Sequence, residues 1–260
     1  MLDIATIEKT GEALYACLRE TRTMPPLSVQ FPGLTIDDAY KISREFLFHR
    51  TTSGEKVVGK KIGVTSPAVQ EMLGVYQPDF GFMTDAMWQR NGIVDTTTLI
   101  APRAEAEIAF RLKDSLSGPG VTPEDVLRAT ESVIACFEIV DSRIENWDIK
   151  ITDTVADNAS CGVFVLSEEE VSPKGLDLAA LKVVVEKNGE FLSEGLGSAV
   201  QGAPENAVAW LANTLGEYGI PLHGGEIVLS GSLVPLAPAS TGDHFTMNID
   251  GLGSAEVRFR

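Results

Sequence analysis

The sequence predicts an α+β protein, in which a mainly helical N-terminal section packs on a β-rich core with inserted helices. Apolar residues recur at helical spacing up to about residue 50, and short apolar or alternating runs typical of strands dominate from residue 95 onward. No linker-like stretch divides the 260 residues, which suit one large domain or two small ones. We therefore expect one continuous unit, with a mainly helical section at 1–75 packed on a β-rich core at 76–260.

Each expected helix combines an apolar face with a start or stop signal. Thr35 can cap the second helix, with Asp38 at the capping-box position. Ser66 followed by Pro67 can open the third, because proline is favoured at the first helical position. The helices are expected at 5–21, 36–50, shortly after Ser66, at 122–131 and at 204–218.

The expected strands are of two kinds. Residues 105–112 alternate between polar and apolar, whereas 132–140 are almost wholly apolar, which is typical of a strand buried on both faces. Asn188-Gly189 favours a type I′ turn between two strands of a hairpin. The remaining strands are expected at 181–186, 191–194, 226–230, 243–249 and 254–259, with one more just before the loop at 59–66.

The charge of the chain limits its partners. A formal net charge of −16 argues against nucleic acid and against anionic membrane surfaces. No apolar run is long enough to span a membrane, and residues 1–20 lack the pattern of a signal peptide. Cys17, Cys136 and Cys161 show no paired spacing, so we expect free, buried thiols in a cytoplasmic protein. A small anionic substrate would need a local positive centre in such a protein.

Three glutamates give the sharpest chemical signal. Glu105 and Glu107 lie two residues apart on an expected strand, so they share one face. Glu138 stands alone within an apolar run, where a carboxylate is costly unless it is paired or binds a metal. Oxygen ligands suit Mg²⁺ or Mn²⁺. A solvent-facing stripe for the pair, and an ion pair of Glu138 with Arg103 or Arg143, remain alternatives.

The loop at 59–66 carries two lysines between glycines. Lys60 and Lys61 could both be solvated, or one could lie in a pocket beside a metal, have a lowered pKa and move protons. Asp79 lies in an expected turn, where most aspartates only cap the backbone. Residues 153–162 are rich in short polar side chains that could bind a carboxylate or satisfy a loop. The three histidines lack ligand spacing.

Several of these segments together resemble the hydratase/decarboxylase family of meta-cleavage pathways, within the fumarylacetoacetate hydrolase-like superfamily. The resemblance covers nearly the whole chain in order. It is carried by residues 59–66 (GKKIGVTS), 77–81 (QPDFG), 102–107 (PRAEAE), 138–143 (EIVDSR), 153–162, 187–189 (KNG), 209–213 (AWLAN) and 230–233 (SGSL).

The resemblance implies a mixed β core, of β-roll or sandwich type, and assigns roles to the candidate residues. It implies that Glu105, Glu107 and Glu138 hold Mg²⁺ or Mn²⁺, and that Lys61 and Asp79 are catalytic. It further implies a homo-oligomer, often a decamer, and association with the pathway decarboxylase. It places the following residues at the substrate: Thr65, Ser66, Asp157, Asn158 and Ser160.

The activity that the resemblance implies is addition of water to 2-hydroxypenta-2,4-dienoate, giving 4-hydroxy-2-oxopentanoate. We hypothesise that Lys61 moves the enol proton and that Asp79, or a water held by the metal, helps deliver hydroxide to C4. The alternatives are 2-oxo-3-hexenedioate (4-oxalocrotonate) decarboxylation, and a structural partner subunit of that decarboxylase. The sequence shows no extra cation for a second substrate carboxylate, and no His–Glu pair for C–C bond hydrolysis.

Overall fold

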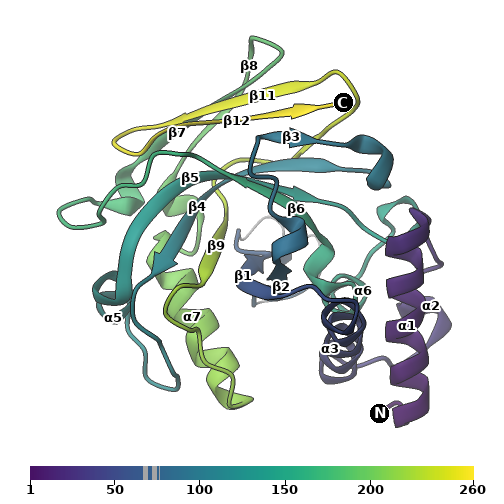
Figure 1. Cartoon of the computed structure of the whole chain (residues 1–260). Helices are drawn as coiled ribbons and strands as arrows, with labels where there is room; N and C mark the ends of the chain where they lie inside the picture. The colour runs from purple at the N-terminus through teal and green to yellow at the C-terminus, as the bar shows by residue number, and fades with distance from the viewer. Residues whose placement is uncertain (67–69, 72–74, 76) are drawn as a thin grey trace.

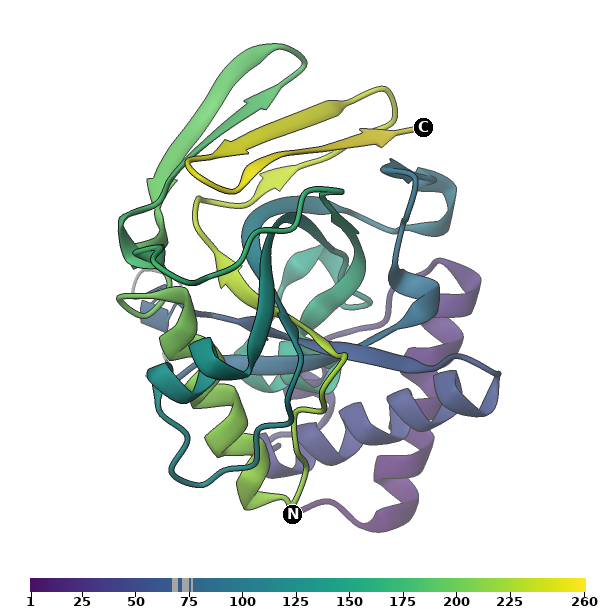
Figure 2. The same ribbon diagram turned by 60° about the vertical axis from the view of Figure 1, so that its left-hand side comes forward.

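The computed structural model of the protein describes residues 1–66, 70–71, 75 and 77–260. In these ranges the strands form a seven-stranded and a five-stranded sheet, which lie one above the other with helices α1, α3 and α7 on the far side of the larger sheet (Figures 1 and 2). The α+β prediction with a mixed β core is therefore confirmed. The helix expected after Ser66 falls mostly outside the described residues.

The larger sheet has the order β2-β1-β9-β4-β5-β6, with β10 paired to β4. All neighbours are antiparallel except β1 and β9, which are parallel. Its strands are β1 (Val57–Gly63), β2 (Asp79–Thr84), β4 (Arg103–Leu112), β5 (Thr130–Val140), β6 (Cys161–Leu166), β9 (Ile227–Ser232) and β10 (Ala237–Pro238).

The smaller sheet has the order β3-β12-β11-β7-β8. The predicted hairpin is present, because Asn188 and Gly189 both have positive φ, 57° and 81°, as a type I′ turn requires. The strands of this sheet are β3 (Ile93–Val94), β7 (Lys182–Lys187), β8 (Glu190–Leu196), β11 (His244–Ile249) and β12 (Gly253–Phe259).

Both long N-terminal helices begin at a side-chain cap, of which the cap at Thr35 was predicted. Asp3 accepts the Thr6 amide at 2.8 Å at the start of α1 (Ile4–Glu20), and Thr35 accepts the Asp38 amide at 3.1 Å at the start of α3 (Ile36–Thr52). The Asp38 carboxylate does not complete a capping box, because it accepts the amide of Leu2 instead. Between them lies α2 (Leu27–Gln30).

Three further α-helices are described: α5 (Pro123–Ala129), α6 (Ile151–Ala156) and α7 (Pro204–Glu217). The expected helix at 122–131 is two residues too long, since β5 already begins at Thr130. The turn expected at 77–81 is wrong from Asp79 onward, where β2 begins. The short 3₁₀ turns are Asp85–Met87, Thr96–Thr98, Glu145–Trp147, Asn158–Ser160, Leu178–Ala180 and Gly197–Ala199.

The two faces of β4 and β5 carry different kinds of side chain. Ala106, Ile108 and Phe110 point into the main hydrophobic core, where Phe137 of β5 meets Phe245 of the smaller sheet with ring centroids 6.3 Å apart. The glutamates predicted to share a face lie on the opposite side of the strands. One face thus joins the sheets by apolar packing, and the other is left for polar side chains.

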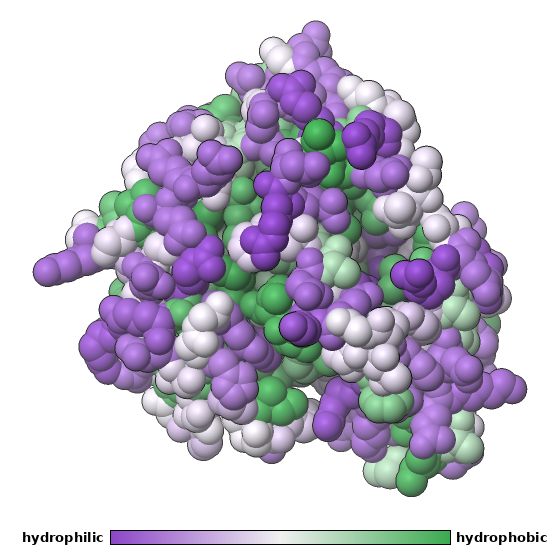
Figure 3. All heavy atoms as spheres, in the orientation of Figure 1, coloured by the Kyte–Doolittle hydropathy of each residue, from purple (hydrophilic) through white to green (hydrophobic). Residues whose placement is uncertain are grey.

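The face of the molecule in Figure 3 is mainly hydrophilic, as the charged composition suggests, and the cysteines are in the state that the sequence predicts. Figure 3 shows hydrophilic residues over most of the face drawn in Figure 1, with hydrophobic residues in small separate groups. The three cysteines are buried and free, as predicted. Within the described part of the chain, no helix is both long and apolar enough to cross a membrane.

Candidate active site

The three glutamates come together on one face of the larger sheet. In the antiparallel pair of β4 and β5, Glu105 lies opposite Glu138, and Glu107 lies opposite Cys136. One carboxylate oxygen of each glutamate lies within 4.8 Å of the others. Glu107 and Glu138 are fully buried, so the alternative of a solvent-facing stripe is wrong.

The oxygens of this cluster fit a hard divalent cation. Oε1 of Glu107 and both carboxylate oxygens of Glu138 are buried without a hydrogen-bond partner among the described residues. Buried carboxylates are costly to leave unsatisfied. An oxygen-only donor set of this kind suits Mg²⁺ or Mn²⁺ better than zinc.

The pKa values of Glu105 and Glu107 show that ionisation of these carboxyl groups is unfavourable when no cation is bound. Burial, and then the neighbouring Glu138, raise the pKa of Glu105 to about 7. The same two causes raise the pKa of Glu107 well above its usual range. Glu105 and Glu107 therefore bind protons more readily than ordinary glutamates unless a cation replaces those protons.

Lys61 and Asp79 lie beside this cluster, on the neighbouring strands β1 and β2. Lys61 Nζ lies 3.2 Å from Oε1 of Glu138. Gly63 leaves the room for this arrangement: a Cβ on Gly63 would stand 2.3 Å from Asp79 Oδ1 and 3.3 Å from Lys61 Nζ. Both charged side chains are buried, so neither a solvated lysine nor a turn-capping aspartate describes them.

The expected lowering of the Lys61 pKa is wrong for the protein alone. Burial would lower this pKa, but Glu138, Asp79 and Glu105 outweigh burial and raise it. Burial, and then Glu138, raise the pKa of Asp79. Lys61 is therefore an ammonium group, and it lies next to a carboxyl group that binds a proton readily.

A chain of hydroxyl groups extends from this pair. Thr154 of α6 donates to Asp79 Oδ2 at 3.4 Å, and its Oγ1 lies 3.2 Å from the hydroxyl of Ser160. Asp79 Oδ1 has no hydrogen-bond partner among the described residues. Ser160 is thus brought to the site as predicted, whereas Thr154 was not singled out, because only the packing of α6 on β2 reveals it.

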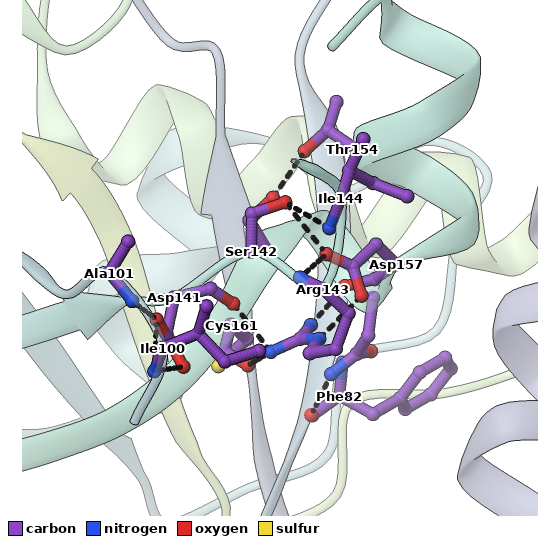
Figure 4. Close-up of polar contacts among 12 residues, drawn as sticks. Phe82, Ile100, Ala101, Asp141, Ser142, Arg143, Ile144, Thr154, Asp157 and Cys161 are labelled. Carbon is purple, nitrogen blue, oxygen red and sulfur yellow. Dashed lines mark hydrogen bonds and ion pairs between the residues drawn. The ribbon is translucent and has the colours of Figure 1, made fainter. Parts of the chain in front are cut away.

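Both carboxylate oxygens of Asp157 accept hydrogen bonds from neighbouring protein groups. Its Oδ1 accepts from Nε of Arg143 at 2.5 Å, and its Oδ2 accepts from the Arg143 amide and the Ser142 hydroxyl. Figure 4 shows the Arg143 guanidinium between Asp141 and Asp157. Both Asp157 oxygens are used within the protein, which opposes the expectation that Asp157 contacts substrate.

Asn158 also holds the protein together. Its side chain accepts the Phe82 amide at 2.8 Å and donates to the Phe82 carbonyl at 2.9 Å, which fixes β2 next to the loop. Asn158, Ala159 and Ser160 have φ values of 55°, 52° and 51°. Three successive non-glycine residues in this region are strained, and strain of this kind is typical of functional loops.

Gly231 connects the loop after β1 to the glutamates. Its amide donates to Oε2 of Glu107 at 2.8 Å, its φ is 111°, and a Cβ there would stand 2.4 Å from Oγ1 of Thr65. Thr65 is buried at this position, and Ser66 follows it. The sequence points to Gly63 only as a glycine beside the lysines and to Gly231 only within the family resemblance, since their contacts depend on which strands become neighbours.

The remaining charged candidates lie elsewhere. Arg143 pairs with Asp157, and the Arg103 guanidinium lies 4.3 Å from the ring centroid of Trp147, so neither is the partner expected for Glu138. Lys60 pairs with Glu226 at 2.5 Å. No histidine joins a metal-type cluster in the described ranges.

Comparison with known proteins identifies the family of the chain. The family described as "Fumarylacetoacetate (FAA) hydrolase C-terminal" matches residues 84–260. The chain is 58% identical to a 2-hydroxyhexa-2,4-dienoate hydratase of Comamonas testosteroni, over 100% of this chain and 99% of that protein. It is 56% identical to a 2-hydroxypent-2,4-dienoate hydratase of Pseudomonas putida, over 84% of this chain and 100% of that protein.

Among solved structures, the 4-oxalocrotonate decarboxylase of Pseudomonas putida G7, complexed with magnesium and adipate, has a TM-score of 0.97 and 36% identity, covering 100% of this chain and 99% of that one. The fold is thus shared by hydratases and a decarboxylase, while the higher sequence identities are to hydratases. The chain belongs to the fumarylacetoacetate hydrolase family and, within it, groups with the 2-hydroxydienoate hydratases.

Proposed function

We propose that the protein is a hydro-lyase that depends on Mg²⁺ or Mn²⁺ and adds water to 2-hydroxypenta-2,4-dienoate, giving 4-hydroxy-2-oxopentanoate. The observation that carries this proposal is the buried triad of Glu105, Glu107 and Glu138, with the ammonium of Lys61 3.2 Å from Glu138. Its relatives at 58% and 56% identity are named as hydratases of such dienoates.

The glutamates would hold the cation through carboxylate oxygens such as Oε1 of Glu107 and Oε2 of Glu138, which have no hydrogen-bond partner among the described residues. When bound, the cation supplies positive charge for the C1 carboxylate and the C2 oxygen of the substrate, in an otherwise acidic protein. Binding of the substrate at this end leaves its C3–C5 segment to the neighbouring side chains of β1 and β2.

Lys61 and Asp79 would handle the protons. The reaction removes a proton from the enol oxygen at C2 and adds one at C5, after which hydroxide from water adds at C4 and a proton adds at C3. Lys61 is positioned to exchange the enol proton with Asp79, whose raised pKa suits a group that is protonated and deprotonated in turn. Thr154 and Ser160 hold the Asp79 carboxylate in place.

Asp157 and Asn158 support this site without touching substrate in our proposal. Arg143 and Phe82 already use their polar atoms, so they hold the loop that presents Ser160. Thr65 and Ser66 remain candidates for substrate contact, since Thr65 lies against Gly231 next to Glu107.

The test is the ultraviolet loss of 2-hydroxypenta-2,4-dienoate with metal-stripped protein, and then with Mg²⁺ or Mn²⁺ restored. We expect no turnover without metal and conversion to 4-hydroxy-2-oxopentanoate with it. Equal turnover after thorough metal removal would contradict the role of the glutamates. Absence of turnover with either metal, together with decarboxylation of 2-oxo-3-hexenedioate, would contradict the hydratase assignment.

A further inference from the structure

A cavity of about 430 Å³ borders the loops on either side of the Lys61–Asp79 pair. Two of its walls join directly to the site: Pro78 precedes Asp79, and Thr65 contacts Gly231, whose amide binds Glu107. The opposite wall is formed by Gln201 and Trp210, from the turn before α7 and from α7 itself.

The lining of this cavity is uncharged. All of the described residues that line it are neutral, including Ser198 and Ala199. The protein as a whole carries a net charge of −16, so no excess of positive charge compensates at longer range. A carboxylate that entered this space would lose its hydration without gaining a cationic partner, which is unfavourable.

Gln201 provides one polar group that the rest of the protein leaves unused. Its Nε2 is buried and has no hydrogen-bond partner among the residues described. Its backbone is held at a φ of 45°, and its carbonyl accepts from the Asn206 side chain at 2.9 Å. Gln201 thus lines the cavity from a fixed backbone position and brings no charge to it.

We propose that this cavity is the subsite for the C5 end of the substrate, that it accepts an uncharged, alkyl-extended end, and that it discriminates against a second carboxylate. This inference rests on the proposed function, because the glutamates must hold the C1–C2 end for the chain to extend past Lys61 and Asp79 into the cavity. Its volume leaves room for groups larger than the terminal carbon of a pentadienoate.

The same inference separates this chain from decarboxylases that share its fold. A dicarboxylic substrate needs a cation for its second carboxylate, whereas the side-chain donors that line this cavity, including the Gln201 amide, are neutral. An amide donor contributes less than a charged partner to holding a carboxylate, so it cannot offset the loss of hydration. Introducing a cation at this position should therefore change the specificity.

The experiment compares two non-reacting acids of equal length, 2-oxohexanoate and 2-oxohexanedioate, by calorimetry with the Mg²⁺-loaded protein. They differ only in a methyl group against a carboxylate at the distal end. We expect 2-oxohexanoate to bind about 30-fold more tightly or better, which corresponds to about 2 kcal/mol. Turnover of 2-hydroxyhexa-2,4-dienoate within about tenfold of the pentadienoate, measured as kcat/KM, is expected alongside.

The variant Gln201→Lys should lower the ratio of the two dissociation constants at least about tenfold, and Gln201→Met, which is uncharged and of similar length, should leave the ratio unchanged. Ser198→Lys places the same charge on another wall, in case the strained position 201 does not tolerate lysine. Equal binding of both acids by the unaltered protein, or identical ratios in the lysine and methionine variants, would overturn the subsite. If the unaltered protein binds 2-oxohexanoate more tightly than 2-oxohexanedioate but converts no dienoate, the subsite is supported and the proposed function is overturned.

Discussion

Lys60 and Lys61 are neighbours in the chain with opposite surroundings. Because successive residues of a strand point to opposite faces, Lys60 reaches Glu226 at 2.5 Å and Lys61 reaches Glu138 at 3.2 Å. Burial lowers the pKa of Lys60, whereas three carboxylates raise that of Lys61. Only Lys61 lies on the face of the glutamates, so only Lys61 can exchange protons with a substrate held there.

Replacement of Lys61 by methionine should remove turnover and keep metal binding. We expect kcat to fall about 10²–10⁴-fold, which is the usual contribution of a general acid or base. The measurements are kcat from the ultraviolet assay and Mg²⁺ affinity from calorimetry. Lys60→Met is the matched control and should reduce kcat less than about tenfold. Similar losses in both variants would show that burial of charge, and not proton transfer, explains the effect.

At the scale of residues, the sequence predicts the glutamate cluster but not the side chains that contact it. The two-residue spacing of Glu105 and Glu107 predicts a shared face, which is confirmed. The pairing of Glu138 with Lys61 depends on strand register and on which strands are adjacent, and a single sequence carries neither. The contact of Thr154 with Asp79 could not be predicted for the same reason.

At the scale of elements, the loop between α6 and β6 is held by one buried ion pair. Arg143 is fully buried and binds Asp157 through Nε, while its terminal nitrogens donate to the carbonyls of Asp141, Asp157 and Cys161. This network fixes the loop that carries Asn158 and Ser160 in its strained conformation. The strained backbone of this loop is thus stabilised by the Arg143–Asp157 ion pair, which lies away from the reacting atoms.

Replacement of Arg143 by methionine should destabilise the protein strongly. It leaves Asp157 as an unpaired buried carboxylate, which costs about 3–5 kcal/mol. The measurement is the free energy of unfolding in urea. Arg128→Met, which removes an exposed ion pair with Asp125, is the control and should cost less than about 1 kcal/mol. A loss below about 1 kcal/mol for Arg143→Met would show that the loop does not depend on this pair.

Element prediction succeeded where local signals are strong. The Thr35 cap, the Asn188-Gly189 turn and the apolar run of β5 each carry their own physical signal, and all three are confirmed. Strand β2 and helix α6 were not predicted, since both are short and are stabilised by neighbours distant in sequence. Both elements contain buried polar residues that bind side chains distant in sequence. Their sequences therefore lack the regular spacing of apolar residues from which a strand or helix is predicted.

At the scale of the whole molecule, pH and metal act on the same carboxylates. A glutamate in the unfolded chain has an ordinary pKa of about 4.5, whereas the pKa of Glu105 in the folded protein is about 7. The folded state therefore binds more protons between these values, so the metal-free protein has this stabilisation below pH 4.5 and loses it as the pH rises through 7. Glu107 shifts in the same direction.

We therefore expect Mg²⁺ to stabilise the protein more at pH 7.5 than at pH 5.5, because the cation replaces protons that the cluster holds at the lower pH. The measurement is the shift in Tm on adding Mg²⁺ at each pH, with calorimetry in two buffers of different ionisation enthalpy to count the protons released. Glu105→Gln is the control and should weaken the pH dependence. An equal Tm shift at both pH values would contradict this linkage.

The position of β9 decides when the site can be assembled during folding. Strand β9 lies between β1, which carries Lys61, and β4, which carries two of the glutamates. A nascent chain that has not yet produced Ile227–Ser232 can form the β4–β5 hairpin with its three carboxylates, but it lacks the strand that brings Lys61 next to them. Contacts this distant in sequence form late and slowly. Competence for catalysis should thus arise only after Ile227–Ser232 has been synthesised, which keeps a shorter nascent chain from acting on substrate.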